Sequence, residues 1–79
     1  MSRSTISKYQ RKIASARFHL LEAFRQCAEL SEIFDEHPSG YAGYFVSCAC
    51  AISEIVKVLE HVFEQAYGRI PDDWEKVRQ

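Results

Sequence analysis

The fold is decided by residues 4–35, STISKYQRKIASARFHLLEAFRQCAELSEIFD, which contain neither proline nor glycine. Apolar or small side chains recur in this stretch with the alternating three- and four-residue spacing of heptads. Four unbroken heptads indicate a long amphipathic helix, with Ser2 or Ser4 as its N-cap and its end near Asp35. The repeating positions are Ile6, Tyr9, Ile13, Ala16, Leu20, Ala23, Cys27, Leu30 and Phe34.

The sequence His37-Pro38-Ser39-Gly40 ends this pattern. Proline disfavours a helical conformation at the residue before it, and glycine permits a positive φ. A connection this short places the next helix antiparallel beside the first. We expect that second helix from about Tyr41 to Tyr67, with Gly68 just beyond its end.

The second helix carries two neighbouring apolar rows. We expect the first row to face the first helix, so that Ala16 lies opposite Val62 or Phe63. The second row is expected on its flank. The facing row is Phe45, Cys48, Ile52, Ile55, Leu59, Val62 and Ala66, and the flanking row is Ala49, Val56 and Phe63.

The C-terminal stretch RIPDDWEKVRQ contains a third helix start, because proline suits the first helical position. Trp74 is expected to fold over the open end of the hairpin near Tyr9, Ile13 and Tyr67. The predicted fold class is therefore all-α: an antiparallel helical hairpin of two long amphipathic helices plus a short C-terminal helix. Residues 1–79 form a single helical domain.

Composition limits the classes of function. The chain has 79 residues, a net charge of −1 and 47% hydrophobic residues, so it is neither disordered nor strongly attracted to nucleic acid by its net charge. It contains no stretch of about 18 uncharged apolar residues, so no membrane span or membrane partner is expected. The basic start MSRSTISKYQRK lacks the apolar run of a secretory signal. Three cysteines match no disulfide pattern, so we expect free thiols in the core and a cytoplasmic protein.

The first helix has more apolar surface than one neighbouring helix covers. A second row lies beside the heptad positions, and the combined apolar arc exceeds half of the helix circumference. About ten C-terminal residues remain to cover this row if no partner does. We therefore expect a homodimer that forms a four-helix bundle, or a protein partner. The predicted interface row is Ala14, Phe18, Leu21, Phe24 and Ala28.

The charges of the first helix oppose its dipole, since cations precede anions along it. Glu54, Glu60 and Glu64 of the second helix are expected beside Arg25, Arg17 and Lys12, respectively. An anionic partner, protein or nucleic acid, is the alternative, with Lys8, Arg11 and Arg25 as its contacts. A solvated face of weak ion pairs explains the same pattern. Tyr41 and Tyr44 are a candidate aromatic contact surface, or they pack the closed end against Ile33 and Phe34.

No arrangement of residues supports catalysis or metal binding. His19-x-x-Glu22 and His61-x-x-Glu64 have the spacing of di-iron helical bundles, but those ligands must point into the core. Here the core positions hold no carboxylate. Cys48 and Cys50 lie about 200° apart on a helix and cannot share an ion. We therefore expect no enzyme activity, no catalytic residues, no metal and no cofactor.

The segment from Ala23 to Phe63 resembles a known superfamily. A long helix, a break, an aromatic entry and then small and aliphatic residues occur here, the second half as SGYAGYFVSCACAISEIVKVLEHVF (39–63). The pattern resembles the uncharacterised branch of the HEPN-like superfamily, whose domains are helical bundles that commonly dimerise. Active members are ribonucleases with Arg, four to six residues, then His, and no Arg in this chain has a His at that spacing.

Two hypotheses about function follow. The first is a non-enzymatic protein-interaction module, such as a small inhibitor, antitoxin or adaptor, that acts as a homodimer. The second, which the resemblance implies, is a non-catalytic, RNA-associated HEPN-like domain in a defence or toxin–antitoxin system. Salt-dependent RNA binding distinguishes the second hypothesis from the first.

Overall fold

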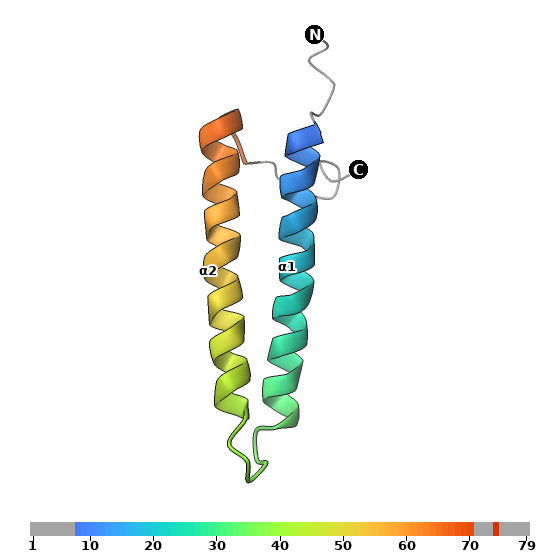
Figure 1. Ribbon diagram of the computed structural model, residues 1–79, viewed down its shortest axis with the longest axis vertical. Helices are drawn as coiled ribbons and strands as arrows, with labels where there is room; N and C mark the ends of the chain where they lie inside the picture. Colours follow the sequence, from blue (N-terminus) through green and yellow to red (C-terminus); the bar gives the residue numbers. More distant parts are fainter. Residues whose placement is uncertain (1–7, 71–73, 75–79) are drawn as a thin grey trace.

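The computed structural model describes residues 8–70 and Trp74. It contains two antiparallel helices, α1 (Lys8–Ile33) and α2 (Ala42–Tyr67), joined at one end by a short turn (Figure 1). The all-α helical hairpin is thereby confirmed. The predicted N-cap at Ser2 or Ser4, the first heptad residue Ile6 and the helix start at Pro71 lie outside the described residues.

The turn begins two residues earlier than expected, and a serine side chain in it accepts a hydrogen bond at the entry to α2. After Ile33 the chain forms a turn with backbone hydrogen bonds between residues three apart, such as that from His37 N–H to Phe34 O (3.1 Å). Gly40 has the positive φ of +74° that its position in the turn predicted. Ser39 Oγ then accepts a hydrogen bond from the backbone N–H of Tyr41 (3.2 Å), one of the donors that the start of α2 leaves without an intrahelical partner.

The end of α2 is closed by Gly68, as the sequence predicts. Gly68 has a left-handed conformation with φ of +83°, and its N–H donates to Glu64 O at 2.7 Å. Glycine adopts this conformation without the steric penalty of a Cβ atom. Glycine at position 68 thus sets where α2 stops.

The core is small and is built on the row of α2 that we expected on the flank. Among the described residues, the buried hydrophobic side chains are Ala14, Ala49, Val56 and Phe63. Ala14 (1% exposed) packs against Phe63 (3% exposed). The expected facing row was therefore partly wrong, because Cys48, Ile55, Val62 and Ala66 are exposed.

The two rows of α2 were indistinguishable by spacing. Both have heptad spacing and both can include Ile52 and Leu59, so either forms a continuous stripe at 3.5 residues per turn. The pairing of the helices also differs by about two residues from the expected register, since Ala14 rather than Ala16 lies against Phe63. Alanine on α1 and phenylalanine on α2 still interdigitate as a large and a small side chain.

Trp74 covers the open end of the hairpin. Its ring centroid lies 5.0 Å from that of Phe63, and the Arg17 guanidinium carbon lies 4.5 Å from the centroid of the indole. Ile13 packs against the same cluster, and Phe63 contacts the ring of Tyr67. Trp74 and Ile13 thus pack against one cluster, Ala14 and Phe63, at the open end where Trp74 was expected.

The hairpin is long and thin. Each helix has 26 residues and is about 39 Å long, and the radius of gyration of the chain is 16.0 Å, whereas a compact chain of this length has about 11–12 Å. Its accessible surface is 5987 Å², whereas a compact monomer of this length exposes about 4,900 Å². Two helices alone leave a large share of their apolar surface in contact with water.

Candidate interaction surface

An exposed apolar row runs along α2, and we call it the α2 stripe. Its large members are well exposed: Tyr44 by 71%, Ile55 by 49% and Val58 by 59%. None of its residues carries a charge. The α2 stripe consists of Tyr44, Cys48, Ala51, Ile55, Val58 and Val62, all classed as exposed.

The α2 stripe has the pattern of a helix-packing seam. Its spacings alternate between four and three residues from Tyr44 to Val62, as in a heptad repeat. At 1.5 Å per residue it extends for about 27 Å. The row that packs on α1 has the same alternation, so α2 carries two seams and the hairpin uses one of them.

Residues of α1 continue this surface. Ala14 and Arg17 contact residues of α2, which fixes the side of α1 that faces α2. With 3.6 residues per turn and antiparallel helices, Leu20 and Cys27 then lie on the same broad side of the hairpin as the α2 stripe. Both are half-buried. The apolar surface is therefore two helices wide.

The interface row predicted on α1 is not part of the surface that the α2 stripe, Leu20 and Cys27 form. Ala14 is buried inside the hairpin and is not available to another chain. Leu21 and Phe24 are just over one third exposed, while Phe18 and Ala28 are half-buried. Helical periodicity places Phe18 on the broad side opposite the α2 stripe. The structure does not bring this row together as one open face.

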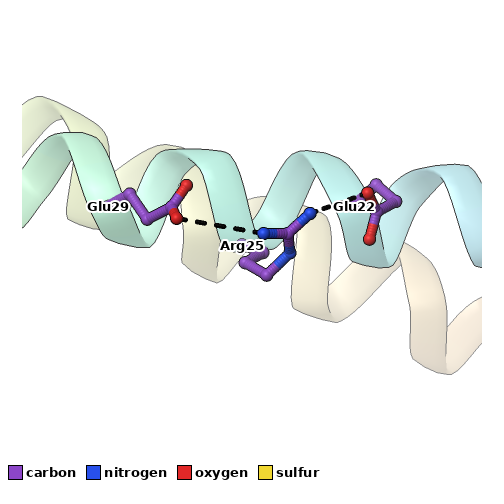
Figure 2. Close-up of polar contacts among 3 residues, drawn as sticks. All are labelled: Glu22, Arg25 and Glu29. Atoms are coloured by element: carbon purple, nitrogen blue, oxygen red, sulfur yellow. Dashed lines mark hydrogen bonds and ion pairs between the residues drawn. The ribbon is translucent and has the colours of Figure 1, made fainter.

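The charge of Arg25, in the middle of α1, is neutralised within the helix. Arg25 lies between two carboxylates: its Nη2 donates to Glu22 (2.8 Å), and its Nη1 lies 3.9 Å from Glu29 (Figure 2). The hydrogen bond from Arg25 to Glu22, and then the charges of Glu22 and Glu29, raise the pKa of the Arg25 guanidinium above its ordinary value. Arg25 is thus committed to its own helix, whereas Lys8 and Arg11 present exposed side chains.

One of the three expected interhelical ion pairs is present. Arg17 Nε donates to Glu60 at 3.0 Å, with both side chains partly buried. Arg25 pairs within α1, as above, and Glu54 pairs with Lys57 within α2 at 3.3 Å. The pairing of Arg17 with Glu60 fixes the register of the hairpin at its open end.

The closed end combines aromatic packing with aromatic exposure. Phe34 contacts the rings of Tyr41 and Phe45, at centroid distances of 6.1 and 5.4 Å. Tyr44 contacts Tyr41 but is otherwise open, and Ile33 is exposed. Tyr41 therefore packs on the turn, and Tyr44 begins the α2 stripe.

The cysteines of the hairpin form no disulfide and belong to no metal-ligating group among the described residues. Cys27, Cys48 and Cys50 are free, as expected, but Cys48 and Cys50 are exposed rather than in the core. In the part of the chain that the structure describes, no three side chains of His, Cys, Asp or Glu form a group that can hold a metal ion.

The apolar character of α2 has a second consequence. By length and composition α2 passes as a membrane-spanning helix, with 11% of its most apolar 18-residue window buried in the hairpin. The criterion of an uncharged stretch did not detect this, because Glu54 and Lys57 interrupt the segment. These two residues form an ion pair on the exposed surface.

The sequence contained the signal for the α2 stripe. The heptad spacing of its residues predicts Cys48, Ile55 and Val62 at the contact with α1. Tyr44 was expected in an aromatic contact surface or in the packing of the closed end, and Ala51 and Val58 had no predicted role. Counting both rows of α2 together shows a helix with one more apolar seam than the hairpin uses.

Comparison with family models, curated proteins and solved structures gives no match to this chain.

Proposed function

We propose that the protein is a non-enzymatic protein-interaction module that acts as a homodimer, with the α2 stripe as the contact between the two copies. The observation that carries the proposal is the imbalance of burial. Among the described residues four hydrophobic side chains are buried, while twelve large hydrophobic side chains are more than one third exposed. A helical domain needs a core larger than this to be stable in water.

A second copy supplies a surface that matches the α2 stripe. It brings an identical stripe of the same length, and a two-fold axis makes each stripe complete the other. The apolar surface is about two helix diameters wide, or about 20 Å, and about 27 Å long. Its area is therefore of the same order as the roughly 800 Å² that each partner buries in a standard interface. The surface of the hairpin in excess of a compact monomer is also of this order.

A matched pair of substitutions tests the proposal. Ile55→Glu places a charge in the α2 stripe, while Val46→Glu places one at a position of nearly equal exposure (49% and 51%) outside it. Light scattering at about 50 μM, where a dimer with a dissociation constant of about 1 μM or lower is populated, should give a dimer mass for the parent chain and Val46→Glu. Ile55→Glu should give a monomer mass.

Three results count against the homodimer. A helical monomer for the parent chain contradicts it directly. Equal dissociation by both substitutions would show that the contact lies outside the α2 stripe. Binding of monomers to phosphatidylcholine vesicles in a flotation assay would assign the stripe to a membrane instead.

A second candidate function rests on the cations at the start of α1. Lys8, Arg11 and Lys12 have exposed side chains within two turns of helix. This arrangement favours the RNA-associated alternative, because clustered cations bind phosphates through counterion release. Binding of single-stranded RNA at low salt, abolished in Arg11→Glu/Lys12→Glu, would support it, and absence of binding at low salt excludes it.

A further inference from the structure

The hairpin is electrically polar along its length. Between Gln26 and Ser53 the chain has four carboxylates and no lysine or arginine, and these carboxylates gather where α1 meets the turn. At the opposite, open end the described cations outnumber the exposed carboxylate there, Glu64. The acidic end carries Glu29, Glu32, Asp35 and Glu36, and the basic end carries Lys8, Arg11, Lys12 and Arg69.

The two ends act as separate charges. Lys12 and Glu36 are separated by most of the length of α1, which is more than the screening length of about 8 Å at physiological salt. Between them, Arg25 is hydrogen-bonded to Glu22, and Glu54 is paired with Lys57. The middle of the hairpin is therefore close to neutral, and the ends determine how a second charged rod aligns with it.

We propose that the two copies in the homodimer lie antiparallel. The two-fold axis passes through the middle of the α2 stripe, at the level of Ser53 along the helix. This inference rests on the proposed function and adds the orientation of the partner. An axis there brings Lys12 of each copy to the level of Glu36 of the other. A parallel dimer sets the acidic ends beside each other and the basic ends beside each other, which is repulsive.

The side chains of the α2 stripe fit the same orientation. With the axis near Ser53, Tyr44 lies at the level of the second copy's Val62, Cys48 at the level of its Val58 and Ala51 at the level of its Ile55. Every layer then joins a larger with a smaller side chain, which fills the space evenly. A parallel pairing in register joins Tyr44 to Tyr44 and Ala51 to Ala51, which crowds one layer and leaves another empty.

Disulfide mapping tests the orientation. The three native cysteines are replaced by alanine, and single cysteines are introduced as Tyr44→Cys and Val62→Cys. The two variants carry tags of different size, are refolded separately and as a mixture, and are oxidised with diamide. Positions 44 and 62 are about 27 Å apart on one helix, while a disulfide requires Cα atoms within about 7 Å.

The antiparallel dimer predicts a disulfide between the two variants in the mixture and none in either variant alone. Disulfides within each variant alone, with a dimer mass by light scattering, would overturn the orientation and leave the proposed function standing. A monomer mass for the cysteine-free chain would instead mean that the proposed function fails. A dimer without disulfides in any sample would overturn the contact through the α2 stripe.

A second pair guards against misfolding of one variant. One variant keeps Cys48 as its only cysteine, and the other carries Val58→Cys in a chain that lacks the native cysteines. Positions 48 and 58 lie closer to the axis than positions 44 and 62, and both variants keep Tyr44. Their mixture should give the same mixed disulfide. Circular dichroism of every variant must show the helix content of the parent chain.

Discussion

At the scale of the residue, the turn depends on side-chain groups that cap the backbone. Ser39 Oγ accepts from Tyr41 N–H, and Ser39 N–H donates to His37 Nδ1 at 3.1 Å. Ser39 Oγ also lies 2.8 Å from the same ring nitrogen. One serine thus links the turn to the first turn of α2.

Ser39→Ala removes the hydroxyl that accepts from Tyr41 N–H at the entry to α2. Its loss should lower the free energy of unfolding by about 0.5–1.5 kcal/mol, as for other single hydrogen bonds. Urea unfolding followed by circular dichroism measures the change. Ser47→Ala, on the exposed surface of α2, is the control and should leave the stability unchanged or slightly higher. An equal effect of both substitutions would show that the hydrogen bond from Tyr41 N–H to Ser39 Oγ does not stabilise the hairpin.

Arg25 makes no contribution to the pH dependence of stability near neutral pH. Its pKa is raised in the folded state, so while Glu22 and Glu29 are ionised the stabilisation is complete below the pKa of the unfolded state. As the pH rises, it is lost only through the folded pKa, in strongly alkaline solution. Arg25→Gln should therefore keep the shape of the stability profile from about pH 6 to 9, and a changed slope in urea unfolding across this range would contradict this.

Single residues were the most predictable part of the fold. Pro38 fixes its own φ, whereas Gly40 and Gly68 permit the positive φ that both adopt. Their roles followed from the sequence alone, because both properties lie in the covalent structure of the residue. The hydrogen bonds of His37 and Ser39 did not, because they exist only once the turn has its conformation.

At the scale of the element, Phe63 holds the two helices together. It is buried and contacts Ala14, Tyr67 and Trp74. Phe63→Ala should lower the free energy of unfolding by about 3–5 kcal/mol, which is much of the stability of a small domain. Trp74 is the only tryptophan of the chain, so its fluorescence reports on unfolding. In Phe63→Ala the fluorescence maximum should shift to longer wavelength at a lower temperature than in the parent chain. Val46→Ala, at an exposed position, should leave the transition nearly unchanged.

Phe18→Asp separates the two rows that compete for the interface. Phe18 is half-buried on the side of the hairpin opposite the α2 stripe. The substitution should lower the thermal transition temperature, because it places a charge in a partly apolar environment. The molecules that remain folded should still have a dimer mass by light scattering. A fully helical monomer of Phe18→Asp would assign the interface to the α1 row.

The elements themselves were predictable, but their facing sides were not. Heptad spacing revealed α1 and α2 because it persists over seven turns of helix. It did not reveal which row of α2 faces α1, because Cys48, Ile55 and Val62 have the same period as Ala49, Val56 and Phe63. Only the packing of Ala14 against Phe63 decides between them.

At the scale of the whole molecule, a net charge of −1 conceals an acidic end and a basic end. If the dimer is antiparallel, Arg11→Glu/Lys12→Glu should raise its dissociation constant at least tenfold at low ionic strength, because like charges then meet. Analytical ultracentrifugation at 20 mM and 500 mM salt measures this, since salt at high concentration should remove most of the difference. Equal dissociation constants at low salt would contradict it.

The central claim is that the hairpin completes its core with a second copy, and the concentration dependence of its thermal unfolding tests it most directly. For a folded dimer, a hundredfold rise in protein concentration, from about 1 to 100 μM, should raise the transition temperature by roughly 5–10 °C. Ile55→Glu should melt at a lower temperature without this dependence. A cooperative transition of the parent chain at one temperature across the whole range would contradict the claim.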